Sequence, residues 1–181
     1  MLMKYLKLFF KKLFRYLLKP LSFLPAILMM SFIFGFSAQD GTASSQVSGA
    51  VTTEIVEFAD RLLDKGWDMQ QISHYAQRLE HYVRKAAHMT EYFLLAVTVA
   101  FPLYVYRLRG FRLVLAAGLF CVLFACLDEY HQSFVPGRSP AVRDIFIDAS
   151  GSLIGIYVTR AVCWFGRKTV FRPLSLSKGD A

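Results

Sequence analysis

The chain alternates between long apolar runs and shorter polar segments. The first run, PLSFLPAILMMSFIFGFSAQ (residues 20–39), contains no charged residue. As a helix it reaches about 30 Å, the thickness of the hydrocarbon core of a bilayer. Three more runs follow at 92–106, 113–127 and roughly 144–165. The pattern predicts an all-α fold, an integral membrane four-helix bundle over residues 20–165.

The second and third runs are too short to cross a bilayer unaided. Their fifteen residues span only about 22 Å as helices, and runs of this length also occur as core helices of soluble proteins. We therefore expect the polar residues that flank them to continue the helices into the membrane.

A long segment at 40–83 separates the first two spans and is predicted to be an external helical loop. Its apolar residues recur at helical spacing and are followed by a glycine. These positions are Val51, Ile55, Phe58, Leu62, Leu63 and Gly66. Asp68 and Gln71 match a capping box. We expect the helix that begins there to run into the second span.

The 181 residues are 55% hydrophobic, with a formal net charge of +8. Six basic residues and no acid lie in residues 1–19. We interpret this segment as a basic amphipathic helix in the plane of the membrane, since its other face is aromatic and aliphatic. A nucleic-acid-binding arm is the alternative, but the apolar face favours anionic lipid, so no nucleic acid partner is expected.

Basic residues also mark which loops face the cytoplasm. Arg107, Arg109 and Arg112 lie between the second and third spans, and the tail 166–181 is basic too. With both termini and this link inside, the cytoplasmic side holds fourteen of the 21 basic residues and one of the 13 acids. A multi-pass protein with cytoplasmic N and C termini is predicted.

A cleaved signal peptide is the competing interpretation of residues 1–38, because Gly35 and Ser37 are small. The length of the apolar run and the bulky Phe34 and Phe36 favour an uncleaved anchor. The three cysteines lie in apolar runs without metal-like spacing. We expect no metal and no cofactor.

Polar residues gather at one end of the second and fourth spans. In RKAAHMTEY, Arg84, His88 and Glu91 share a helical face, with Lys85 and Tyr92 at its margin. In DIFIDASGSLIG, Asp144 and Asp148 share a face with Gly151 and Gly155. These glycines form a G-x-x-x-G, which lets a neighbouring backbone approach closely.

A third cluster, DEYHQSFVPGR, follows the third span (residues 128–138). Pro136 and Gly137 suit a type II turn, which would hold Arg138 near Asp128, Glu129 and the start of the fourth helix. Ionised carboxylates at membrane depth cost about 2.5–3.5 kcal/mol. We therefore expect them to turn towards partners, namely the arginines at 84, 138 and 143.

The three clusters permit a structural and a functional interpretation. Each alone is compatible with helix capping, contact with lipid phosphate, or simple packing. Their convergence from three spans favours a function. We expect a shared external pocket lined by His88, Glu91, Asp128, Arg138 and Asp144.

These three segments, in this order and spacing, resemble the VanZ-like membrane protein family. The resemblance covers about residues 20–165 and implies a bacterial cytoplasmic-membrane protein of a family linked to resistance to glycopeptide antibiotics, especially teicoplanin. The family pattern falls on Arg84, Lys85, His88, Glu91, Tyr92, Asp128, Glu129, Gln132, Pro136, Arg138, Asp144 and Gly151. At Asp148 the family often has Asn, and His131 and the basic N-terminus are less typical of it.

Several functions fit these residues. The first is binding of, or action on, an envelope lipid or lipid-linked precursor. The candidate binding residues are Arg84, Lys85, Tyr92, His131, Gln132, Arg138, Asp144 and Asp148. The second is a membrane-embedded acid/base hydrolase or transferase, with His88, Glu91, Asp128 and Glu129 as hypothetical catalytic residues.

A metal-dependent version would use His88, Glu91, Asp128, Glu129 and His131, but no H-E-x-x-H is present and the nearby arginines disfavour a cation. Four spans without a duplicated half make a monomeric transporter a poor match. The sequence does not decide whether the protein is an enzyme.

The topology predicts the outcome of reporter fusions. Reporters fused after Gly41 and after Gly137 should read external, and one fused after Gly110 should read cytoplasmic, because the basic link at 107–112 is retained inside. An external reading at Gly110 would show that the topology is wrong.

Overall fold

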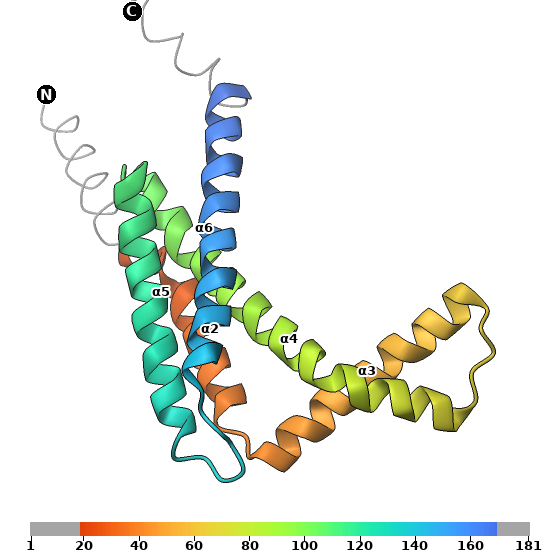
Figure 1. Cartoon of the computed structure of the whole chain (residues 1–181). Helices are drawn as coiled ribbons and strands as arrows, with labels where there is room; N and C mark the ends of the chain where they lie inside the picture. Colours follow the sequence, from red (N-terminus) through yellow and green to blue (C-terminus); the bar gives the residue numbers. More distant parts are fainter. Residues whose placement is uncertain (1–18, 170–181) are drawn as a thin grey trace, which may run out of the picture.

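The computed structural model describes residues 19–169, and within that range it is helical, without a strand. The helices are α2 (Leu24–Ser37), α3 (Gly41–Leu63), α4 (Met69–Val105), α5 (Phe111–Gln132) and α6 (Val142–Thr169). Helices α2, α5, α6 and the second half of α4 form a bundle, and α3 with the first half of α4 forms an arm that projects sideways (Figure 1). The predicted all-α fold is confirmed.

Four helices in the described range are long and apolar enough to cross a membrane, at 19–37, 69–105, 111–132 and 142–168. They correspond to the four predicted spans. The predicted amphipathic segment lies outside the described residues except for Lys19, and so does the basic tail beyond residue 169.

Helix α4 begins at the predicted capping box and continues without a break into the bundle. The Asp68 carboxylate accepts a hydrogen bond from the Gln71 N–H at 2.8 Å. The Gln71 side chain accepts one from the Asp68 N–H at 3.0 Å. Helix α3 ends at Leu63, before the predicted Gly66, because Asp64 adopts the left-handed conformation (φ 49°) that short polar side chains tolerate.

The polar residues after the third apolar run belong to helix α5 itself. Its 22 residues correspond to about 33 Å, enough to cross the hydrocarbon core. Asp128, Glu129 and Gln132 are buried in its last turns, so they face other helices. Helix α6 is also longer than predicted and ends at Thr169.

Helices α4 and α6 are in backbone contact at the predicted G-x-x-x-G. A Cβ atom added at Gly151 would lie less than 3.0 Å from the Met89 carbonyl oxygen, and one at Gly155 less than 3.0 Å from that of Phe93. Only glycine permits this approach at both positions. The main apolar core surrounds this contact and includes Ile33, Tyr92, Leu95, Leu113, Phe124 and Ile156.

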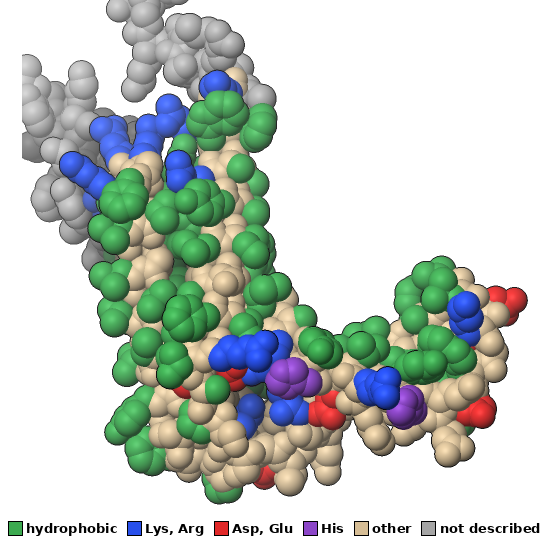
Figure 2. Space-filling model, in the orientation of Figure 1, with side chains coloured by type: hydrophobic (Ala, Val, Ile, Leu, Met, Phe, Trp, Pro, Cys, Tyr) green, Lys and Arg blue, Asp and Glu red, His purple; other side chains and the backbone are tan. Residues whose placement is uncertain are grey.

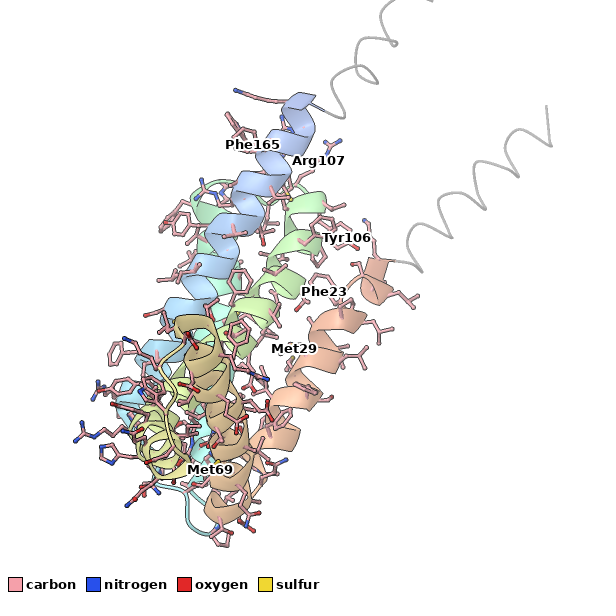
Figure 3. All side chains as sticks on the ribbon, turned by 90° about the vertical axis from the view of Figure 1, so that its right-hand side faces the viewer. Phe23, Met29, Met69, Tyr106, Arg107 and Phe165 are labelled. Carbon is pink, nitrogen blue, oxygen red and sulfur yellow. The ribbon has the colours of Figure 1, made fainter. Side chains whose placement is uncertain are left out.

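The two ends of the bundle differ in chemistry. At one end, where α2 begins and α4 ends, the Tyr106 hydroxyl donates to the Lys19 carbonyl at 2.7 Å, and its ring lies 6.0 Å from that of Phe23 (Figure 3). Lysine and arginine side chains gather at this end (Figure 2). We call it the basic end; it includes Arg107, Arg109, Arg112, Arg167 and Lys168.

The opposite end, called the polar end here, carries the turn at 135–138. The Arg138 N–H donates to the Val135 carbonyl at 3.2 Å, and Gly137 has φ +73°, as the predicted turn requires. The Gly41 N–H donates to the Pro136 carbonyl at 3.0 Å. This turn therefore also holds the start of α3.

The α4–α6 contact predicts that Gly151→Ala destabilises the fold. The added methyl group must displace the Met89 carbonyl, an overpacking cost of about 1–3 kcal/mol, and should lower the thermal midpoint of the monodisperse protein in detergent. Gly35→Ala is the control, because a Cβ there meets nothing within 4 Å and alanine has the higher helix propensity. Equal midpoints for both variants would contradict the packing described.

Candidate functional site

A cleft of about 240 Å³ lies where the arm meets the polar end of the bundle. Figure 2 shows charged and histidine side chains on the surface where the arm joins the bundle. The polar part of the lining is Gln39, Ser44, Ser48, Arg84, His88, Glu91 and Arg138. The apolar part is Phe32, Phe36, Val47, Val51, Val83 and Ala87. Helices α2, α3 and α4 and the 135–138 turn therefore all contribute to one amphipathic cleft.

Helix α3 fixes the side chain of Arg84. The guanidinium forms an ion pair with Glu80, one turn earlier on α4, and donates to the hydroxyl groups of Ser45 at 2.8 Å and Ser48 at 3.2 Å. Ser48 also donates to Glu80 at 2.9 Å. The expectation that Arg84 pairs with Glu91 or Asp144 is wrong, because its contacts turn it towards α3.

Arg138 is bound to backbone carbonyl groups at the end of α2. Its Nε donates to the Gln39 carbonyl and its Nη2 to the Phe36 carbonyl, both at 3.1 Å. No carboxylate of residues 19–169 lies within ion-pair distance of it. Burial lowers the pKa of Arg138, and the positive charge of Arg84 lowers it further. The positive charge here is therefore only partly compensated.

His88 and Glu91 line the cleft one turn apart on α4. The His88 Nδ1 and the Glu91 Oε2 are 3.6 Å apart, slightly beyond hydrogen-bond distance. Glu91 Oε2 is buried and has no hydrogen-bond partner among the described residues. The two groups therefore form an adjacent pair with unused hydrogen-bonding capacity, the kind of pair that can move a proton.

Behind the cleft, Asp128 ties α5 to α2. It is 1% exposed, and its Oδ2 accepts hydrogen bonds from the Ser37 hydroxyl at 2.8 Å and the Gln132 amide at 3.1 Å. The Gln132 amide also donates to the Ser37 hydroxyl at 3.1 Å. These bonds give Asp128 and Gln132 a role in holding the helices together.

Two further carboxylates are engaged at the start of α6. Asp144 forms an ion pair with Lys85 of α4, so the prediction of an arginine partner is wrong. Glu129 accepts a hydrogen bond from the Ala141 N–H, just before α6 begins. Asp148 is 4% exposed, and its Oδ1 has no partner among the described residues.

The structure divides the five residues expected in one pocket. His88, Glu91 and Arg138 line the cleft, whereas Asp128 and Asp144 do not. Asp128 is nevertheless close enough to Glu91 and Arg138 to interact with both electrostatically. The cluster on α4 and Arg138 therefore meet in the cleft, whereas the cluster on α6 lies outside its lining.

Six of the eight predicted binding residues lie outside the cleft lining, namely Lys85, Tyr92, His131, Gln132, Asp144 and Asp148. Two of them, His131 and Tyr92, pack against aromatic rings. The ring of His131 packs edge-on against Phe34, with 5.3 Å between centroids. Tyr92 is fully buried in the core, and its ring lies 6.1 Å from that of Phe124. Neither lines the cleft, although the Tyr92 hydroxyl interacts electrostatically with Asp128, Asp148 and Glu91.

Buried polar atoms without a partner in the described protein are concentrated in this region. They are Arg84 Nε, Glu91 Oε2, Tyr92 OH, Asp128 Oδ1, His131 Nδ1 and Asp148 Oδ1. All come from the three segments singled out in the sequence. The same region contains no group of three potential metal ligands, and none occurs elsewhere in residues 19–169.

Sequence reasoning missed the contributions of α2 and α3. The Ser37 hydroxyl of α2 donates to Asp128. The carbonyl groups of Phe36 and Gln39 accept hydrogen bonds from Arg138. The serines at 45 and 48 of α3 accept hydrogen bonds from Arg84. A serine at the end of an apolar run is a weak signal, and a backbone carbonyl leaves no signal at all. The serines at 44, 45 and 48, close together at the start of the loop, are a second weak signal.

A comparison with protein-family models matches residues 22–165 to the VanZ/LLP1 family. Comparisons with curated proteins and with solved structures find no match. The matched range contains α2 to α5, most of α6 and every residue of the cleft. The chain therefore belongs to the VanZ/LLP1 family.

Proposed function

We propose that the cleft binds the phosphate-bearing headgroup of an envelope lipid or lipid-linked precursor. The observation that carries the proposal is the placement of Arg84 and Arg138 in one cleft, with the Arg138 guanidinium bound, among residues 19–169, only to carbonyl groups. Two guanidinium groups that face the same space repel each other. A phosphate between them would relieve that repulsion and accept charge-assisted hydrogen bonds.

The pKa of Arg138 supports an anionic ligand. Burial and the charge of Arg84 both lower that pKa, so the protonated guanidinium is held at a free-energy cost. An anion bound at the cleft would offset this cost, because opposite charges stabilise each other strongly in a partly desolvated site. A cationic or neutral headgroup without phosphate would not offset the cost of holding the charged guanidinium.

The apolar part of the lining supports a lipid over a soluble phosphate. Phe32 and Phe36 belong to a candidate membrane span, and Val47 and Val51 face them from α3. A cleft that is polar at one side and apolar at the other matches a headgroup joined to an acyl or prenyl chain. The bound molecule would then enter from the bilayer.

This placement gives the protein a role at the cell envelope. With the polar end external, as the loop charges predict, the cleft lies at the outer face of a bacterial cytoplasmic membrane. Binding there would change the supply or exposure of an envelope lipid. That provides a route by which a member of this family alters susceptibility to glycopeptide antibiotics such as teicoplanin.

Arg138→Gln should remove phospholipid that co-purifies with the protein. Loss of a charged hydrogen bond costs about 1.5–3 kcal/mol, which weakens binding roughly tenfold or more. The measurement is quantitative mass spectrometry of lipid extracted from protein purified in detergent. Arg84→Gln should have the same effect.

Arg143→Gln is the matched control, because Arg143 is exposed and outside the cleft. It removes the same charge five residues away and should retain the lipid. If Arg138→Gln and Arg84→Gln both retain wild-type amounts, the proposal is wrong.

The second candidate function is acid/base catalysis on the bound lipid. It is favoured by Glu91, whose buried Oε2 has no hydrogen-bond partner in the part of the chain that the structure describes and lies 3.6 Å from His88 Nδ1 inside the cleft. In this mechanism the oxygen of a water or hydroxyl group attacks phosphorus while Glu91 accepts its proton. The bond from phosphorus to the leaving oxygen breaks, and His88 relays that proton to the leaving oxygen. Arg84 and Arg138 stabilise the negative charge that develops on the phosphate.

Glu91→Gln distinguishes binding from catalysis. If the protein converts its lipid, this variant should still co-purify lipid but lose conversion by about 10²–10⁴-fold, with membrane abundance unchanged. The assay follows headgroup release from the co-purified lipid class. Asp128→Asn, outside the cleft lining, should instead lower membrane abundance, because it weakens the bonds to Ser37 and Gln132. Failure of Glu91→Gln to accumulate would assign Glu91 to folding as well.

A further inference from the structure

Helix α3 carries an apolar stripe that is not covered by any part of the described chain. Its five side chains are between 47% and 72% exposed: Val47, Val51, Ile55, Phe58 and Leu62. Their spacing of four, four, three and four residues places them on one face of the helix. The stripe therefore runs along almost the whole of α3.

This stripe is not needed for packing within the arm. The arm has its own small core, formed by Val56 of α3 with Ile72 and Ala76 of α4, against which Trp67 packs. These residues lie on a different face of α3 from the stripe. Charged residues of α3, such as Glu57 and Arg61, also lie outside the stripe. Helix α3 therefore has one face packed against α4, a separate exposed apolar face, and charged residues beside it.

We propose that the stripe docks into the lipid bilayer, so that the arm lies in the membrane interface at the polar end of the bundle. The occupant is bilayer lipid because the stripe is continuous with a lipid-facing surface. Val47 and Val51 line the cleft together with Phe32 of α2, and Phe32 is 53% exposed on a candidate membrane span.

The direction of the arm supports the same occupant. The arm slants back alongside the bundle from its polar end and does not extend beyond that end (Figure 1). A helix that returns towards the membrane-spanning part of the molecule brings its apolar face to lipid and its charged faces to headgroups and water. An arm that pointed away from the bundle would instead leave the stripe to water or to a soluble partner.

Docking of the arm has a consequence for the cleft. Because Val47 and Val51 belong both to the stripe and to the cleft lining, the embedded arm would place the mouth of the cleft against the hydrocarbon–headgroup boundary. A lipid could then enter sideways without leaving the bilayer. The position of the arm itself does not depend on what the cleft binds.

The test uses tryptophan emission from the full-length protein in vesicles of phosphatidylcholine with brominated acyl chains. Trp67 and Trp164 are first replaced by Phe, and Phe58→Trp then supplies the only tryptophan. Its emission should fall about twofold or more relative to unbrominated vesicles, because bromine quenches a ring inserted among the acyl chains. Leu62→Trp is a second probe on the same stripe.

Glu57→Trp is the control, at the same distance along the arm but about 100° around the helix. It should be quenched much less than Phe58→Trp. Equal quenching at 57 and 58, or no quenching at either 58 or 62, would overturn the proposal whatever lipid the cleft retains.

A second copy of the chain is the alternative occupant. Phe58→Cys, introduced after replacement of Cys121, Cys126 and Cys163 by Ala, should remain monomeric on mild oxidation if lipid covers the stripe. Disulfide-linked dimers in vesicles would show that protein covers it.

Discussion

The backbone contact between α4 and α6 is the interaction on which the rest of the structure depends. Gly151 and Gly155 bring α6 against the Met89 and Phe93 carbonyl groups, and these carbonyls lie in the same turns as His88 and Glu91. The contact therefore fixes the depth of the α4 polar residues relative to those of α6. It also places Lys85 beside Asp144, at the point where the two helices reach the polar end.

The low polarity of a bilayer then separates the polar residues into two groups. Asp128 accepts a hydrogen bond from Ser37, Glu129 accepts one from the Ala141 N–H, and Asp144 forms an ion pair with Lys85. Such groups stabilise the bundle, because an unpaired ionisable group in hydrocarbon is costly. Arg138, His88 and Glu91 are less completely engaged and line the cleft. Incomplete pairing in a cleft is the physical basis for assigning them a function.

Local features were predictable from the sequence and long-range pairings were not. The capping box at Asp68 and the turn at Gly137 depend on neighbouring residues, and the G-x-x-x-G depends on one helix face. In contrast, the partner of each charge depends on how the helices rotate about their axes. The rotation of α4 and α6 brings Lys85 within ion-pair distance of Asp144, and that of α4 turns Arg84 towards α3. The spacing of residues along the chain does not specify these rotations. The cleft wall formed by α3 likewise requires the fold of the arm.

The most direct test of the central claim is a distance-sensitive NMR measurement on the protein in native-like bilayers. With ¹⁵N-labelled arginine, the bound lipid phosphate should dephase a guanidinium signal through ¹⁵N–³¹P coupling. That dephasing should disappear in Arg138→Gln and persist in Arg143→Gln. Dephasing that is unchanged in Arg138→Gln, or that disappears only in Arg143→Gln, would contradict a phosphate site in the cleft.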